Sequence, residues 1–184
     1  MNFLEHYFIE KENVVYKLSS TQVNLNEEIA DKVTDFSSKI PDEFIYEDPE
    51  DDSYGREDQI HVTALYGIHD ELPEETKEVL KNVEPFEVTL GDISYFEADK
   101  YDVMKIEIES EALHNINKLL RDNVEYTNQY DEYIQHCTVA YVTKDFSRDS
   151  IDNETFNDLT QTITEVIFSS KNGKNYIIKL KEKE

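Results

Sequence analysis

The sequence has little cysteine, little positive charge and no long apolar run. Its one cysteine, Cys137, cannot form an internal disulfide, which is typical of a reducing compartment. One cysteine and five scattered histidines give no paired ligands with zinc-site spacing, so we expect no tightly held metal and no cofactor. No apolar run approaches the roughly 20 residues that span a bilayer, and residues 1–16 lack the features of a signal peptide. We therefore expect a soluble, cytoplasmic protein with no membrane partner.

Lys and Arg are few beside the acidic residues: 18 against 42, for a formal charge of −24. Proteins that grip duplex nucleic acid draw most of their affinity from Lys and Arg that neutralise phosphates, so we expect no duplex partner. Leu, Ile, Val and Phe make up more than a quarter of the chain, above the roughly 20 per cent below which highly charged chains are usually disordered. At this length we expect a single domain over residues 1–184.

Hydrophobic patterns divide the chain into strands and helices. Alternating patterns predict five strands: Tyr16–Leu25, Ile60–Tyr66, Phe86–Glu97, Asp102–Glu109 and Ile134–Val142. Helical spacing predicts three helices: Asn26 to Lys39, Pro73–Val83, and a helix capped by Ser110 that ends at Asn123. Near the end, Asn172-Gly173 between Thr162–Ser169 and Tyr176–Leu180 predicts an antiparallel hairpin. The order of these elements reads as two similar halves and favours the α+β class.

The stretch from Glu47 to Asp58 has almost no apolar content. We expect it to be a solvated loop, either a mobile flap or a simple linker.

The hexad His-x-Thr-x-x-Tyr occurs twice, starting at His61 and at His136, and each copy lies in a predicted strand. Because side chains alternate along a strand, His61 shares a face with Thr63, and His136 shares a face with Thr138. Two such strands facing one cleft bring two imidazoles and two hydroxyls to a single small anion. The alternative is that both rings are ordinary half-buried strand histidines that donate to backbone carbonyls.

Three other residues of the hexads are expected to be structural. By alternation Tyr66 and Tyr141 face away from the histidines and pack, and Cys137 is expected to be a buried thiol and not a nucleophile. His69, after a turn at Gly67, is expected to be solvated.

These motifs resemble the 2H phosphoesterases, a family named for two H-x-[ST] motifs, one in each pseudo-symmetric half. The resemblance extends over most of the chain, and the residues around the motifs, from His61 to His69 and from Gln135 to Val142, are similar to small bacteriophage members. It implies a bilobal fold with pseudo-two-fold symmetry, in which two antiparallel sheets with flanking helices surround a central cleft. It also implies a metal-independent reaction; some such relatives cleave cyclic oligonucleotide signals of antiphage defence, and others open 2′,3′-cyclic phosphates.

The residues suit such a reaction. Imidazole titrates near pH 6.5, so one ring can act as base and the other as acid near neutral pH, although the sequence does not say which is which. The base removes a proton from water or a ribose hydroxyl, the acid protonates the leaving oxygen, and Thr63 and Thr138 bind the phosphate oxygens. Few cations lie near the motifs in the sequence, and the nearest are Arg56 and Lys144. We therefore expect phosphate binding to rest chiefly on hydroxyls, imidazolium and backbone N–H groups.

The net charge favours a small or cyclic nucleotide substrate over a long RNA, which would meet repulsion along many phosphates. An RNA 2′,3′-cyclic phosphodiesterase or 2′-5′ RNA ligase-like enzyme is the alternative within this class. A non-catalytic acidic protein that mimics nucleic acid, with residues 47–58 as its contact surface, is the alternative of another class. Three tyrosines before the second motif are candidates for stacking on a base or for covering an apolar edge: Tyr126, Tyr130 and Tyr133.

Overall fold

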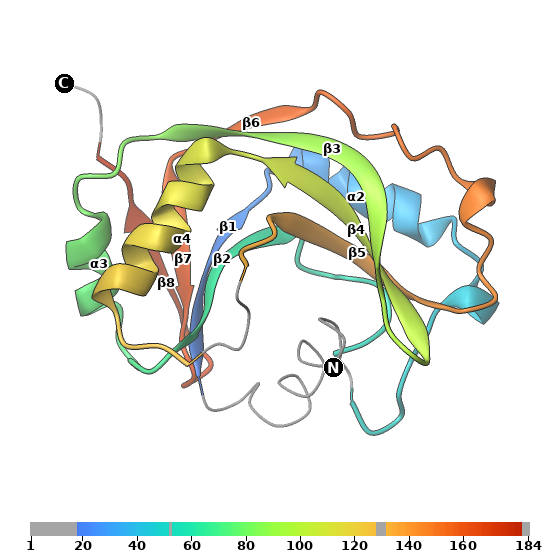
Figure 1. Cartoon of the computed structure of the whole chain (residues 1–184), viewed down its shortest axis with the longest axis horizontal. Coiled ribbons are helices and arrows are strands. Elements are labelled where there is room, and N and C mark those ends of the chain that lie inside the picture. The colour runs from blue at the N-terminus through green and yellow to red at the C-terminus, as the bar shows by residue number, and fades with distance from the viewer. Residues whose placement is uncertain (1–17, 52, 128–131, 182–184) are drawn as a thin grey trace.

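The computed structural model describes residues 18–51, 53–127 and 132–181. Eight antiparallel strands form one curled sheet in the order β6-β3-β4-β5-β2-β1-β7-β8 (Figure 1). The strands are β1 Ser19–Asn24, β2 His61–Ile68, β3 Phe86–Glu97, β4 Tyr101–Glu109, β5 His136–Thr143, β6 Thr160–Ile163, β7 Glu165–Ser169 and β8 Asn175–Lys179. The helices are α2 Glu27–Ser38, α3 Glu74–Leu80 and α4 Glu111–Asn123, with short 3-10 turns η1 Asp42–Phe44 and η2 Arg148–Ser150.

The two longer helices begin where their caps predict. The Asn26 side chain accepts a hydrogen bond from Ile29 N at the start of α2, and the Ser110 hydroxyl accepts one from Leu113 N at the start of α4. Each helix buries one apolar face against the sheet. None of the helices in the described ranges is long and apolar enough to cross a membrane.

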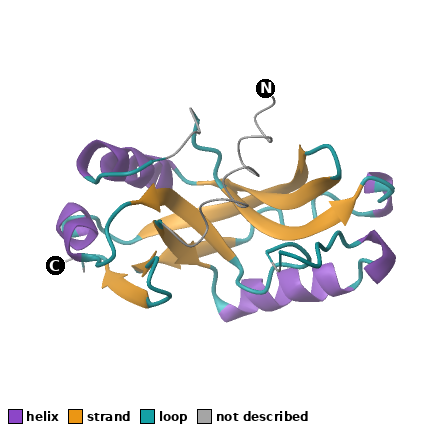
Figure 2. Ribbon diagram, turned by 90° about the horizontal axis from the view of Figure 1, so that it is seen from below, coloured by secondary structure: helices purple, strands orange, loops and turns teal. Residues whose placement is uncertain are grey.

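The α+β class is confirmed, and the two expected sheets are joined edge to edge. One half contains β6, β3, β4 and β5, the other β2, β1, β7 and β8, and they meet through a single pair, Val62 and Cys137. Helix α4 packs on β2 of the opposite half, and α2 packs on β5. In Figure 2 the helices lie at the left and along the lower right of the strands. This exchange of helices gives the two halves one common core.

The predicted strand from Thr162 to Ser169 is two strands. It is broken at Thr164, so that β6 pairs with β3 at one edge of the sheet while β7 pairs with β1 in the other half. Two consecutive polar residues, Thr164 and Glu165, interrupt the alternation at the break, but they do not reveal the change of partner. The hairpin after it forms as predicted, with Gly173 at φ 81° in the turn.

The end of the acidic stretch is held against the sheet, because residues 54–57 lie along β5. The Tyr141 N–H donates to the Gly55 carbonyl at 2.8 Å, and the Glu57 N–H donates to the Val139 carbonyl at 3.0 Å. The Tyr54 ring packs between the rings of Tyr101 and Tyr141, 5.1 Å from each. Backbone pairing and one aromatic side chain therefore hold a segment that composition alone marks as solvated.

Candidate active site

The pairing of Val62 with Cys137 fixes how the two motifs meet. Both side chains are fully buried on the helix side of the sheet. Because β2 and β5 are antiparallel, the residues flanking this pair also lie opposite one another: His61 beside Thr138, and Thr63 beside His136. These four side chains share the other face of the sheet, and directly opposed residues on one face have Cβ atoms about 5 Å apart. The structure thus brings the four predicted site residues together.

Both histidine rings are oriented by the same kind of hydrogen bond. His61 Nδ1 lies 2.5 Å from the Gln59 carbonyl oxygen, and His136 Nδ1 lies 2.7 Å from the Ile134 carbonyl oxygen. A carbonyl oxygen only accepts, so Nδ1 carries a hydrogen in both rings and Nε2 is the nitrogen that gains or loses a proton. The backbone bond expected of an ordinary strand histidine is therefore present, and it prepares each ring for proton transfer at Nε2.

The expectation that Tyr66 and Tyr141 face away from the histidines is wrong. Each motif strand contains a β-bulge, with Ala64 as the extra residue in β2 and Val139 as the extra residue in β5. A bulge places two consecutive residues on the buried side, so the following side chains return to the face of the histidines. Tyr141 lies there in a cluster of aromatic rings, with only 2% of its surface exposed.

Different groups hold the two bulges. In β2, Asn117 Nδ2 donates to the Ala64 carbonyl at 2.6 Å, and the Leu65 N–H donates to Thr21 Oγ1 at 3.1 Å. In β5, the Val139 carbonyl accepts from the chain segment that precedes the first motif. Both extra residues thus have partners that fix the local bend.

The segment before each motif borders the strand of the other motif. Residues 55–57, ahead of the first motif, run along β5. Residues 125–127, ahead of the second motif, run along β2, where the His69 N–H donates to the Glu125 carbonyl and the Thr127 N–H donates to the Gly67 carbonyl. Beyond their one shared pair, β2 and β5 therefore have different neighbours.

The sequence analysis missed Lys105, which lies opposite Thr138 on β4. Its side chain is almost wholly buried, with 4% of the residue exposed, and its Nζ donates to Ser94 Oγ at 2.5 Å. The ammonium also lies 4.7 Å from the centre of the Phe96 ring, and that ring meets the His136 ring edge to face at 4.9 Å. A cation thus lies within the site although none was expected there.

Burial lowers the pKa of His136 to about 4, and the neighbouring charges of Lys105 and His61 act in the same direction, while the hydrogen bond to the Ile134 carbonyl opposes them. His136 is therefore neutral at pH 7. Its pKa lies below the near-neutral value that we expected from the sequence for both rings. Burial raises the pKa of the Cys137 thiol to about 12, so this thiol stays protonated, as expected of a buried structural cysteine.

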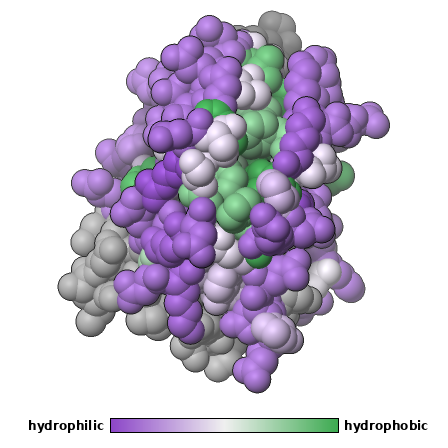
Figure 3. Space-filling view, turned by 90° about the vertical axis from the view of Figure 1, so that its right-hand side faces the viewer, coloured by the Kyte–Doolittle hydropathy of each residue, from purple (hydrophilic) through white to green (hydrophobic). Residues whose placement is uncertain are grey.

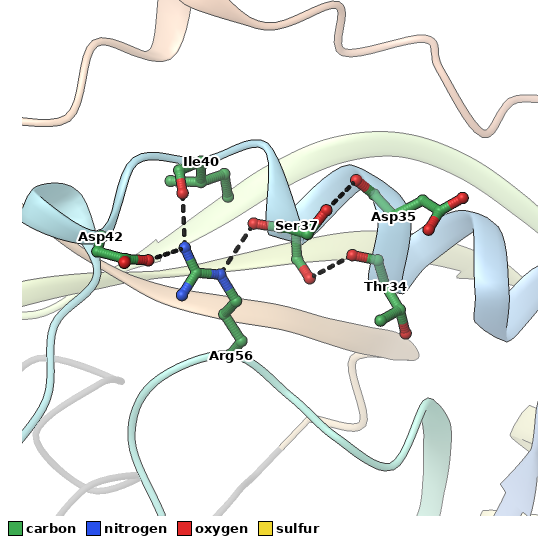
Figure 4. Close-up of polar contacts among 7 residues, drawn as sticks. Thr34, Asp35, Ser37, Ile40, Asp42 and Arg56 are labelled. Carbon is green, nitrogen blue, oxygen red and sulfur yellow. Dashed lines mark hydrogen bonds and ion pairs between the residues drawn. The ribbon is translucent and has the colours of Figure 1, made fainter.

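The two cations nearest to the motifs in the sequence are engaged elsewhere. Arg56 donates to the carbonyl oxygens of Ser37 and Ile40 at the end of α2 and pairs with Asp42 at 2.8 Å (Figure 4). Lys144 pairs with the buried carboxylate of Asp102 at 2.5 Å. Arg56 thus ties residues 55–57 to the end of α2, and Lys144 ties the end of β5 to β4.

His69 and two of the three candidate tyrosines also have structural partners. The His69 ring contacts Thr127 Oγ1 and the Glu125 carboxylate, so it is not simply solvated. The Tyr133 hydroxyl donates to the Thr63 carbonyl at 2.7 Å, and Tyr126 accepts from Arg121. Both tyrosines line a cavity of about 610 Å³ beside α4. Tyr130 lies outside the described residues.

A second hollow, of about 490 Å³, lies where the end of α2 approaches η1 and η2. Figure 3 faces this side of the molecule and shows apolar surface between hydrophilic rims. Neither hollow is lined by a residue of the two motifs. Within residues 18–51, 53–127 and 132–181, no three His, Cys, Asp or Glu side chains gather as metal ligands do.

Residues 47–175 match the model of the 2′-5′ RNA ligase superfamily, which confirms the resemblance to the 2H phosphoesterases. The fold is similar to TT0787 of Thermus thermophilus, with TM-score 0.64 and 16% identity over 91% of this chain and all of that one. Escherichia coli LigT has TM-score 0.56 and 17% identity over 90% of this chain and 95% of that one. Kluyveromyces marxianus Usb1 has TM-score 0.55 and 12% identity over 91% of this chain and all of that one. No curated protein sequence matches the chain.

Proposed function

Because the chain belongs to the 2′-5′ RNA ligase superfamily, a group of enzymes that act on phosphodiester bonds, we propose that it hydrolyses a small or cyclic nucleotide, with His61 and His136 as its acid–base pair. The observation that carries the proposal is the pairing of Val62 with Cys137. It sets two imidazoles, each with a protonated Nδ1, beside two threonine hydroxyls on one face.

The lowered pKa of His136 supports a division of work between the rings. His136 is neutral at pH 7 and acts as the base: its Nε2 takes a proton from water, or from a ribose hydroxyl of the substrate, as that oxygen attacks phosphorus. His61 gives its Nε2 proton to the leaving ribose oxygen as the bond from phosphorus to that oxygen breaks. Thr63 and Thr138 donate to the non-bridging oxygens, where negative charge builds up in the transition state.

When water attacks, the products are a phosphate monoester end and a free hydroxyl. The two protonation states are then exchanged, and proton transfer to solvent restores the starting enzyme.

The overall charge supports a small substrate. A formal charge of −24 repels a long RNA along many phosphates, whereas a small or cyclic nucleotide brings few charges to the buried ammonium of Lys105. LigT has been crystallised with phosphate and with 3′-AMP, and Usb1 with uridine monophosphate, ligands of the size proposed here. Within this class we propose cyclic oligonucleotide signals of the kind used in antiphage defence as the substrate.

A substrate panel tests the proposal. The protein is mixed, with a chelator present, with cyclic mono- and oligonucleotides, 2′,3′-cyclic phosphates and 2′-5′-linked oligomers. We expect turnover of at least one of them, and a loss of at least 100-fold in His61→Ala and in His136→Ala. His114→Ala, an exposed position on α4, is the matched control and keeps the wild-type rate.

Wild-type protein that turns over nothing, or a double variant as active as the wild type, defeats the enzymatic proposal and leaves a non-catalytic acidic protein. Turnover confined to the 2′-5′-linked oligomers or to 2′,3′-cyclic ends would assign the chain to RNA processing.

A further inference from the structure

The two halves of the site are alike in backbone and unlike in charge. Outside each motif strand lies a partner strand, β1 beside β2 and β4 beside β5, and the registers correspond. Gln22 lies opposite the first threonine of the site, Thr63, as Lys105 lies opposite the second, Thr138. Two positions along, Asn24 lies opposite His61.

Glu107 corresponds to Asn24, since Glu107 lies opposite His136 as Asn24 lies opposite His61. In the first half the two side chains are amides joined by a hydrogen bond of 3.0 Å, from Gln22 Nε2 to Asn24 Oδ1. In the second half they are ions, with Lys105 Nζ 3.8 Å from the Glu107 carboxylate. A pseudo-symmetric site thus has a neutral half and a charged half.

We propose that Lys105 is a positioning residue that adds to the inequality of the two histidines: it favours His136 as the base and draws the phosphate toward Thr138. This rests on the proposed function, which treats the two rings as one acid–base pair. No such role follows from the motifs themselves, because they are the same in both halves.

The surroundings of the ammonium support this role. Burial lowers the pKa of Lys105, and the Glu107 carboxylate acts in the opposite direction. Ser94 Oγ accepts one hydrogen of the ammonium and the Phe96 ring faces it, so these contacts offset part of the cost of burying the charge. A positive charge close to an imidazole disfavours a second proton on that ring. The same charge attracts a phosphate that arrives between the two rings.

Burial is the largest cause of the lowered pKa of His136, and among the charged groups around the ring Lys105 is the one outside the pair that adds to it. From β4 the ring is faced by Lys105 and Glu107, from β3 by the uncharged ring of Phe96, and from β2 by His61. The Glu107 side chain is 54% exposed, so water screens its charge more than that of the buried ammonium. His61 is itself one of the pair.

The test replaces Lys105 with glutamine, the residue type at the corresponding position, Gln22, of the neutral half. In Lys105→Gln, the titration midpoint of His136, followed by NMR of its ring protons without substrate, is expected to rise by about one pH unit. Lys105→Arg keeps the charge and is expected to leave the midpoint near the wild-type value. Gln22→Met, at the corresponding position of the other half, is the matched control and leaves the His136 midpoint unchanged.

Activity is the second readout. The acid limb of kcat/KM is expected to move upward with the His136 midpoint in Lys105→Gln and to return in Lys105→Arg, a pattern that a purely structural lysine would not give. A His136 midpoint that does not move in folded Lys105→Gln overturns the inference. Since the titration needs no substrate, it is decided even if the panel finds no activity, and in that case only the proposed function fails.

Discussion

Gly67 lies where residues 125–127, ahead of the second motif, contact β2. Replacing it tests whether this close contact requires glycine. Gly67 has φ 93°, and an added Cβ would overlap the carbonyl oxygen of Thr127 at well under van der Waals distance. Gly67→Ala must therefore push residues 125–127 away from the strand. That movement breaks two hydrogen bonds, from His69 N–H to the Glu125 carbonyl and from Thr127 N–H to the Gly67 carbonyl.

The expected loss follows from these contacts. Two backbone hydrogen bonds contribute about 1 kcal/mol each, and a non-glycine residue at positive φ adds about 1 kcal/mol of strain. We therefore expect Gly67→Ala to lower the free energy of unfolding by about 3 kcal/mol, measured by urea denaturation followed by circular dichroism.

Gly173→Ala is the matched control. Gly173 also has positive φ, at 81°, but an added Cβ would meet no atom within 4 Å. Gly173→Ala introduces only the backbone strain, so we expect it to lower the free energy of unfolding by about 1 kcal/mol. Equal losses in the two variants would refute the argument that close approach to Thr127 is what requires glycine at position 67.

Three further predictions concern the site. Thr63→Val and Thr138→Val each remove one donor to the phosphate, and we expect kcat to fall about 100-fold, whereas rates within twofold of wild type would exclude the hydroxyls from catalysis. Asn117→Ala leaves the buried Ala64 carbonyl without its donor, so denaturation should show a loss of about 2 kcal/mol; no loss would mean that the bulge does not depend on this bond. The lowered pKa of His136 means that the base accepts protons from the substrate at every pH above about 4, so kcat/KM should hold its plateau down to pH 5 and fall tenfold per unit below pH 4. An acid limb near pH 6.5, in protein that circular dichroism shows to be folded, would contradict this assignment.

Local signals predicted much of the fold. The caps at Asn26 and Ser110 placed two helices, and β3 has the predicted bounds, because each depends on residues close together in the sequence. The hexads likewise predicted which four side chains share the site face. Their roles as acid, base and phosphate donors stay predictions until activity is measured.

The rest depends on contacts between residues distant in the sequence. Alternation cannot indicate a bulge, although the consecutive buried pairs Ala64-Leu65 and Val139-Ala140 were a usable sign of one. Lys105 was missed because only strand pairing brings β4 beside β5, yet a lysine between the apolar residues Met104 and Ile106 was a sign of a specific role. The break between β6 and β7 falls at two consecutive polar residues, Thr164 and Glu165, but the pattern does not show that the chain changes its pairing partner there.

The central claim is that one phosphate contacts both histidines. The most direct test adds inorganic phosphate to the protein and follows the ring-proton NMR signals of His61, His136 and His114, assigned from the three alanine variants. The account predicts that the His61 and His136 signals move together with one dissociation constant, that His61→Ala weakens the response of His136, and that His114 stays still. Signals that respond with different constants, or a His136 response that does not change in His61→Ala, would contradict it.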